Sequence, residues 1–206
     1  NVGDAGGAIG SALVSASRSE KKFKNVKMTN PFLGPSYTNE YIEKNIISIL
    51  RRTGHNINYK NYENFEEIIE EVCKLLLNKK VIGWFQDKME WGPRALGNRS
   101  IIADPRNENV RDLINLKIKK REDFRPFAPS IMSEFTQDYF DINNNVDSPF
   151  MTMVVDAKQK ALKEVPGVVH VDGTSRVQTV SKEFNNKFYS LIQNFYKMTN
   201  VPILLN

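Results

Sequence analysis

Apolar residues recur at helical spacing in four parts of the chain: residues 6–17, 39–52, 63–78 and 183–198. Intervals of three and four positions bring such side chains onto one face of a helix, so each segment predicts a helix that packs against a core. Thr38 and Gly54 strengthen the second prediction, because they suit the N-cap and C-cap of a helix. We expect its inward face to consist of Tyr41, Ile42, Asn45, Ile46, Ile49 and Leu50.

The first of these helices and one further helix have additional features in the sequence. Small residues dominate 6–17, which favours close packing of that helix, and Asp4 lies just before it as a candidate cap. Residues 107–119 predict a fifth helix, whose last residues are cations that a helix C-terminus favours.

Short apolar runs between the helices predict strands at residues 81–86, 100–105, 127–132, 150–155 and 201–205, with 55–59 a weaker candidate. The 81–86 run is continuous, as in a strand buried on both faces. Residues 168–173 and 176–180 alternate around Asp172, Gly173 and Thr174, which predicts a hairpin. Because helices and strands are interspersed, the predicted class is α/β, a sheet with covering helices.

Residues 18–37 combine charges with proline and glycine, which is linker composition and predicts a domain boundary. The chain starts and stops within patterned sequence, so we expect it to be part of a longer protein. Its 206 residues, 40% of them apolar, suffice for a buried core. The formal net charge of +5 favours an anionic ligand, and less strongly a nucleic acid.

Cys73 is the single cysteine and falls in a helical apolar pattern. A disulfide within the chain is therefore excluded, and a reducing cytoplasm is the expected location. The apolar runs are far shorter than the ~18 residues that a membrane span needs, so we expect no membrane partner.

Four cations adjoin glycine or proline turns, where a fixed backbone aims a side chain: Arg94, Lys119, Arg125 and Arg176. Guanidinium groups bind phosphate or carboxylate in a bidentate manner, and lysine adds a point charge. Together they suit a ligand with several negative oxygens. For any one of them alone, a structural role is the stronger interpretation, with Asp87, Glu90, Glu122 and Asp123 as possible ion-pair partners.

Other catalytic patterns are weak. The two histidines, His55 and His170, show no metal-binding spacing, and the sequence contains neither a Walker loop nor a Gly-x-Ser-x-Gly elbow. Cys73 is a poor nucleophile candidate because its helix face is expected to be buried. The residues alone thus predict an anion-binding α/β domain and name no reaction.

Several long motifs carry a resemblance to a known family: residues 89–101, 104–106, 121–129, 170–180 and 201–206. In them the sequence strongly resembles the O-carbamoyltransferases, which include the nodulation-factor, cephamycin and tobramycin carbamoyltransferases. The likeness covers the chain from about residue 30 onward, together with the opening residues 3–6.

The resemblance implies two domains. Residues 1–29 would be the tail of an actin-like ATPase-fold domain with a linker, and residues 30–206 a YrdC-like domain with a twisted mixed sheet, incomplete at its C-terminus. In that family the YrdC-like domain makes carbamoyl adenylate from carbamoyl phosphate and ATP and releases pyrophosphate. The N-terminal domain then passes the carbamoyl group to a hydroxyl of the acceptor.

The resemblance also implies roles for residues. Arg94, Lys119 and Arg125 would be catalytic, and with Arg176 and Asn206 they would hold carbamoyl phosphate and ATP, the latter with Mg²⁺. Asp4 matches an aspartate that ligates a divalent metal, Fe²⁺ or another, in the N-terminal domain. Its partner histidines would precede residue 1, so Asp4 alone should bind metal weakly. A Thr-Ser-Phe-Asn stretch would follow Asn206 and help to line the nucleotide site.

The alternative function is a non-catalytic RNA-binding module, since the segment between Arg111 and Arg125 is rich in cations. Stacking on bases would need aromatic side chains among those cations, and only Phe124 and Phe127 are close. Nucleic acid is therefore the weaker prediction. The acceptor and the oligomeric state are not predictable from the sequence.

Overall fold

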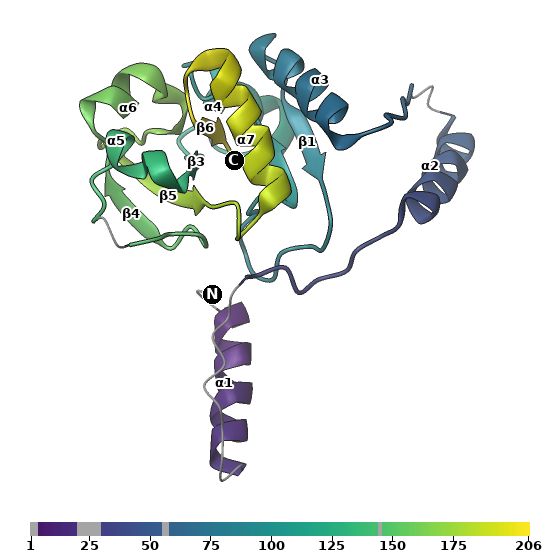
Figure 1. Cartoon of the computed structure of the whole chain (residues 1–206), viewed down its shortest axis with the longest axis horizontal. Coiled ribbons are helices and arrows are strands. Elements are labelled where there is room, and N and C mark those ends of the chain that lie inside the picture. Colours follow the sequence, from purple (N-terminus) through teal and green to yellow (C-terminus); the bar gives the residue numbers. More distant parts are fainter. Residues whose placement is uncertain (1–3, 20–29, 55–57, 144–145) are drawn as a thin grey trace.

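A mixed sheet of four strands forms the centre of the computed structural model, which describes residues 4–19, 30–54, 58–143 and 146–206 (Figure 1). The strand order is β4-β5-β3-β6, from Met153–Asp156, Thr174–Val180, Pro129–Met132 and Ile203–Leu205. β3 runs parallel to β5, with Ser130 opposite Gln178, whereas the other two pairs are antiparallel. The predicted α/β class with a mixed sheet is confirmed.

A β-hairpin extends this sheet at the β6 edge. It consists of β1 (Ile82–Phe85) and β2 (Arg99–Ile102), which pair in antiparallel fashion. Directly after β2, the backbone N–H and C=O of Ala103 bond to Leu205 at 3.2 and 3.0 Å. The loop between β1 and β2, which carries Arg94, is thereby anchored on the main sheet.

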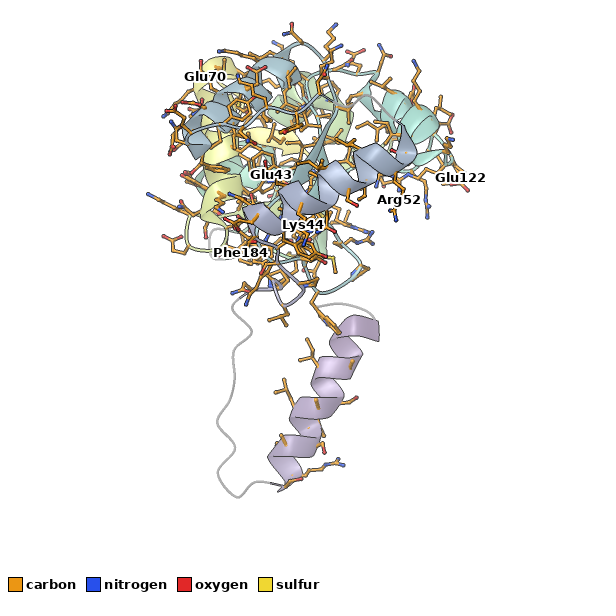
Figure 2. All side chains as sticks on the ribbon, turned by 90° about the vertical axis from the view of Figure 1, so that its right-hand side faces the viewer. Glu43, Lys44, Arg52, Glu70, Glu122 and Phe184 are labelled. Atoms are coloured by element: carbon orange, nitrogen blue, oxygen red, sulfur yellow. The ribbon has the colours of Figure 1, made fainter. Side chains whose placement is uncertain are left out.

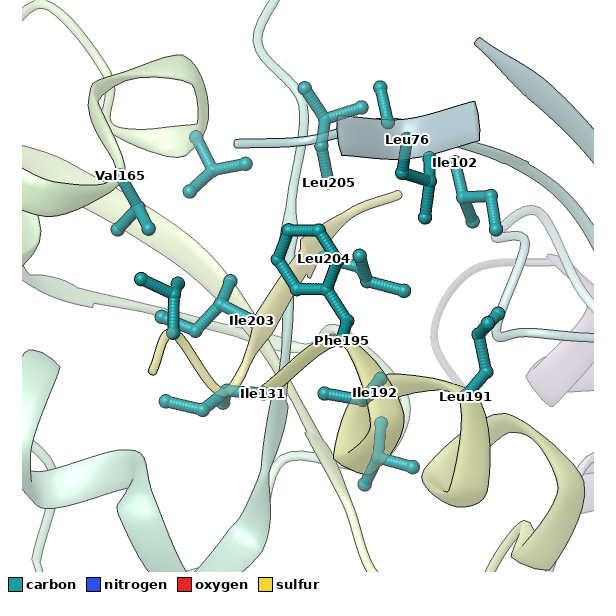
Figure 3. Packing of buried hydrophobic residues seen from close by; sticks show 14 of the residues in the cluster. Leu76, Ile102, Ile131, Val165, Leu191, Ile192, Phe195, Ile203, Leu204 and Leu205 are labelled. Atoms are coloured by element: carbon teal, nitrogen blue, oxygen red, sulfur yellow. The ribbon is translucent and has the colours of Figure 1, made fainter. Parts of the chain in front are cut away.

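Two amphipathic helices cover the sheet and close the core. α7 (Asn186–Thr199) packs on β3 and β6, and α3 (Phe65–Leu77) packs against α7 and β1 (Figure 1). Their apolar faces meet strand residues in one fully buried cluster, part of which Figure 3 shows, including Leu76, Ile102, Ile131, Leu191, Phe195 and Leu204. Cys73 belongs to it and is 0% exposed, and burial raises the pKa of its thiol to about 12. The expectation that Cys73 is buried is confirmed.

Short helices connect the strands. α4 (Val110–Asp112) continues as a π-helix, η1 (Leu113–Lys119), so the helix predicted over 107–119 is present but its second part has the wider π pitch. The remaining turns are η2 (Ser133–Phe135), α5 (Thr136–Tyr139), α6 (Gln159–Glu164) and η3 (Pro166–Val168).

The first two helices lie outside the layered body. α1 (Asp4–Ser19) projects away from it, and α2 (Asn39–Thr53) lies to one side, as Figures 1 and 2 show. Thr38 and Gly54 cap α2 as predicted, with the Tyr41 N–H donating to Thr38 Oγ1. Its supposed inward face is nevertheless not buried: Tyr41, Ile46 and Ile49 are exposed, at 54%, 41% and 47%, and Ile42, Asn45 and Leu50 are only half-buried. Leu13 of α1 is exposed too. The predictions that these helices pack closely inward were wrong, because amphipathic spacing does not say what lies beside a helix. Within the described ranges, no helix has the length and apolar character needed to cross a membrane.

Two strand predictions were also wrong. Residues 168–173 form no strand: η3 ends at Val168, and β5 pairs with β3 and β4 instead of folding back on its preceding residues. β1 is an edge strand with Phe85 54% exposed, not a strand buried on both faces. The weak candidate at 55–59 lies partly outside the described residues, and residues 58–59 are not in a strand.

Gly97 offers a test of how the hairpin loop packs on α7. Its φ is +107°, and a Cβ built there would overlap the ring of the fully buried Phe188. We expect Gly97→Ala to lower the free energy of unfolding by about 3 kcal/mol, from overpacking and left-handed backbone strain together. Urea denaturation measures this. Gly83→Ala is the matched control, since its Cβ would meet nothing within 4 Å; equal stability of the two variants would contradict the packing.

Candidate functional site

The loop between β1 and β2 brings the first cation, Arg94, into place. Gly92 and Gly97 bracket it with φ of +121° and +107°, a region that L residues rarely adopt, so glycine is required at both bends. The sequence-based prediction of a glycine-bracketed turn is therefore confirmed.

A buried carboxylate holds this loop from within. Glu90 is 6% exposed, and its Oε1 accepts hydrogen bonds from the backbone N–H groups of Leu96, Asn98 and Arg99 at 2.8, 2.8 and 3.1 Å. Three donors converging on one oxygen fix the loop's curvature. The sequence suggested Glu90 only as an ion-pair partner, and its position inside the loop was not foreseen.

An amide network ties the same loop to α7. Asn98 Oδ1 accepts from Gln86 Nε2 at 2.9 Å and from Asn185 Nδ2 at 2.8 Å, and Asn185 is the N-cap of α7. The cation-bearing loop therefore rests on the helix that closes the core.

Arg99 has a structural role. Its guanidinium donates to the carbonyls of Gln86, Asp87 and Pro35, and its Cζ lies 3.5 Å from the centre of the Phe85 ring. The segment before α2 joins the same assembly, because Trp91 N–H donates to Pro31 O at 2.6 Å. Residues 31–35, expected to be linker, thus pack against the loop.

The end of η1 supplies the second side of the site. Buried Asn115 donates through Nδ2 to the carbonyls of Asp123 and Arg125, while its Oδ1 accepts from Arg121 Nε at 2.7 Å. Lys119 and Arg121 both lie over the ring of Phe127, at 6.0 and 5.0 Å from its centre. One buried amide and one aromatic ring thus position two cations.

β5 and the turn before it form the third side. Arg176 is on β5, and the turn is closed by Asp172 Oδ1, which accepts from the Thr174 N–H and hydroxyl. His170 Nδ1 lies 3.0 Å from Thr174 Oγ1. This turn orients the His170 ring.

These three sides surround one cavity of about 220 Å³. Four of its lining residues are cations, namely Arg94, Lys119, Arg121 and Arg176. Among the described residues that line it, none has a carboxylate side chain. The rest of the lining is Pro93, Ala95, Ile101, Pro126, Phe127, Ala128, Met151, His170 and Asn206.

The cations affect one another's protonation. Burial, then the charge of Arg176, lowers the pKa of Arg94; burial, then the charge of Arg121, lowers the pKa of Lys119. Burial also lowers the pKa of Arg121, with a further contribution from Arg125 that Glu122 opposes. Mutual repulsion of cations in a partly desolvated cavity is relieved when an anion enters, so the cavity is suited to a polyanion.

The predicted site residues are largely brought together. Arg94, Lys119, Arg176 and Asn206 line the cavity, whereas Arg125 does not: its side chain is 55% exposed and lies 4.0 Å from Glu122. The roles proposed for these residues stay predictions. The side chain of Asp4 lies outside the described residues, so its metal role stays a prediction too. In the part of the chain that the structure describes, no three His, Cys, Asp or Glu side chains group as a metal site.

Two lining residues were missed. Arg121 had no turn signal of its own and entered only through a family motif. His170 was assigned to a strand that does not exist, and it too entered only through a family motif, that of residues 170–180.

The fold and cavity define an α/β domain with a cavity lined by four cations. Comparison with known sequences identifies the family: the carbamoyltransferase C-terminus family matches residues 73–206. The chain belongs to this family.

The chain is also similar in sequence to several whole proteins. The chain is 38% identical to the uncharacterised protein sll1178 of Synechocystis, across 100% of the chain and 36% of the relative. It is 37% identical to nodulation protein NolO of Bradyrhizobium diazoefficiens, across 98% and 36%. Nodulation protein U of Sinorhizobium fredii is 36% identical across 67% and 24%. The chain therefore spans about a third or less of the length of these relatives.

Glu90 provides the test of the site's architecture. We expect Glu90→Ala to lower the free energy of unfolding by about 2–4 kcal/mol, because three backbone N–H groups lose a buried acceptor. Glu90→Gln keeps an amide oxygen and should cost less. Urea denaturation measures both, with Glu122→Ala as the control, since that carboxylate is 61% exposed and should contribute little. A Glu90→Ala variant as stable as the control would refute the carboxylate's role.

Proposed function

We propose that this chain is the part of a carbamoyltransferase that forms carbamoyl adenylate from carbamoyl phosphate and ATP. The observation that carries the proposal is the convergence of four cations on one cavity that has no carboxylate in its described lining. Family membership supports carbamoyl transfer in general, and the cavity supports a substrate rich in phosphate oxygens.

The proposed chemistry has two steps. Water cleaves carbamoyl phosphate to carbamate and inorganic phosphate. A carbamate oxygen then attacks the α-phosphorus of ATP, the bond from that phosphorus to the oxygen of the leaving pyrophosphate breaks, and carbamoyl adenylate forms. Both reactants of the second step are anions, so their repulsion must be offset before the reacting atoms can meet.

The residues of the cavity suit this task. Arg94 and Arg176 are close enough for their charges to interact, and so are Lys119 and Arg121. Preorganised cations stabilise charge that develops at the α-phosphorus and on the departing pyrophosphate. A Mg²⁺ ion that accompanies ATP would help the cations to offset the charge of the triphosphate.

Transfer of the carbamoyl group to an acceptor hydroxyl belongs, in this proposal, to an N-terminal domain of the same protein. The divalent metal expected there, with Asp4 as one ligand, is part of the same proposal. A cytoplasmic location is likewise proposed.

The cavity favours a small ligand over RNA. The cations surround a hollow of about 220 Å³, and Phe127 is buried beneath two of them, where it cannot stack on a base. Phe124 is 74% exposed but stands alone among the cations. RNA binding, which needs a charged groove with accessible aromatic rings, is therefore not the function we propose.

Removal of one cavity cation tests the proposal. In the intact protein, we expect Arg94→Ala or Lys119→Ala to reduce carbamoyl-phosphate-dependent pyrophosphate release from ATP by about 10²-fold or more. Thermal unfolding should change little, because both side chains are exposed at the cavity. Lys74→Ala is the control, since Lys74 pairs with Glu70 on the surface of α3. Near-normal release in both cavity variants would overturn the site assignment.

A second pair of variants tests whether substrate binds the cation that lines the cavity or the one that the sequence motif predicted. The structure lines the cavity with Arg121 and leaves Arg125 beside Glu122 at the surface. If substrates bind to the cavity in this shape, Arg121→Ala should reduce pyrophosphate release more than Arg125→Ala, by about 10-fold. The reverse ranking would show that Arg125 moves into the site when substrate binds.

A further inference from the structure

Gln178 lies on the same strand as Arg176, two residues further along β5. Side chains two positions apart in a strand lie on the same face of the sheet, so Gln178 extends from β5 on the face that carries Arg176. Arg176 lines the cavity, whereas Gln178 is 0% exposed and does not. Gln178 is therefore a buried amide next to one of the cavity cations.

The Gln178 amide joins β5 to the loop that carries Arg94. Its Nε2 donates to the backbone carbonyl of Leu96 at 2.9 Å, and its Oε1 accepts from the Ser130 hydroxyl at 2.6 Å. Ser130 lies opposite Gln178 in the parallel pairing of β3 with β5. A backbone carbonyl can only accept, so the amide nitrogen must face Leu96, and the orientation of the amide is fixed.

Two other ties of the loop leave its distance from β5 open. Glu90 belongs to the loop itself, so its bonds to backbone N–H groups fix the shape of the loop and not its place beside β5. Asn98 ties the end of the loop that adjoins β2 to α7. Leu96 is two residues from Arg94, and its bond to Gln178 therefore acts on the part of the loop that carries the cation.

Arg94 and Arg176 repel each other. After burial, the charge of Arg176 is the second cause that lowers the pKa of Arg94. Without a bond between the segments that carry them, this repulsion would move the loop away from β5 until a ligand drew it back. A site that its ligand must first assemble binds more weakly, because part of the binding free energy is used for the rearrangement.

We propose that Gln178 is a positioning residue, which holds Arg94 beside Arg176 and so sets the separation of the two guanidinium groups before a polyphosphate binds. The inference rests on the proposed function, since it assumes that the cavity binds phosphate groups. Gln178 touches no ligand in this proposal. It acts through the Leu96 carbonyl and the backbone of the loop.

Calorimetry of inorganic pyrophosphate binding to the intact protein tests this role. We expect Gln178→Met, which keeps the length of the side chain but lacks the donor, to bind pyrophosphate about 10-fold more weakly. Gln178→Asn keeps the donor but is one methylene shorter and does not reach Leu96, so it should show a similar loss. Either variant is sufficient if the other fails to fold.

Ser130→Ala is the matched control. It also removes a hydrogen bond from the buried Gln178 amide, but Oε1 still accepts from Asn206 Nδ2 at 3.1 Å, and the bond to Leu96 is kept. Its pyrophosphate affinity should stay within about 2-fold of that of the unaltered protein, since the loop keeps its tie to β5. Thermal unfolding of all three variants separates a loss of stability from a loss of affinity.

A double-mutant cycle shows whether Gln178 acts through Arg94. In an Arg94→Ala background, Gln178→Met should weaken pyrophosphate binding by less than about 2-fold, because the side chain that it positions is gone. In a Lys119→Ala background the loss of about 10-fold should remain, since Lys119 belongs to η1 and not to the loop. A general loosening of the fold would give the same loss in both backgrounds, and this result would overturn the proposal.

The outcomes distinguish this inference from the proposed function. If either Gln178 variant binds pyrophosphate as tightly as Ser130→Ala does, the positioning role is refuted and the cation cavity is left intact. Failure of the unaltered protein to bind pyrophosphate would overturn the proposed function, and this inference with it.

Discussion

The hydrogen bonds that Glu90 accepts from three backbone N–H groups are the constraint on which the site depends. A loop that carries a cation next to other cations is unstable by itself, since repulsion favours an open conformation. The buried Glu90 oxygen accepts these hydrogen bonds and holds the loop closed around Arg94. Glu90 itself does not line the cavity. The loop's outer side is held as well, by Arg99 and by the Pro31 carbonyl. The loop is therefore held from both sides without any ligand.

The same logic applies to the other two sides. Asn115 fixes the turn after η1, and Asp172 with Thr174 fixes the turn before β5, in each case through short bonds to the backbone. The cations themselves make few such bonds and keep their charge available. Neutral and acidic side chains behind the cavity thus hold the cations close together despite their mutual repulsion. Binding of a polyanion would relieve this repulsion.

Family membership and cavity geometry answer different questions. The match over residues 73–206 shows that the chain belongs to the carbamoyltransferase C-terminus family. The cavity shows which side chains of this chain meet at one place, and there it departs from the motif: Arg121 lies inside and Arg125 outside.

Local chemistry in the sequence determined the elements whose structure depends on near neighbours. The period of apolar residues predicted α3 and α7, Thr38 and Gly54 predicted the ends of α2, and the glycines around Arg94 predicted a turn. These features follow from backbone sterics and helix geometry within a few residues. Three of the four cavity cations were also foreseen, because each adjoins a turn or a helix end.

Only the tertiary structure decided what lies beside each element. Val169 and Val171 alternate with His170 and Asp172 as in a strand, yet Val169 is buried whereas Val171 is 94% exposed. β5 instead pairs with β3 and β4, contacts between residues far apart in the chain. His170 lines the cavity because this distant pairing of β5 places the turn before it. Ile46 and Ile49 of α2 stay exposed because no described element covers them. Pairing and burial of this kind depend on distant residues, and so no local pattern of the sequence could determine them.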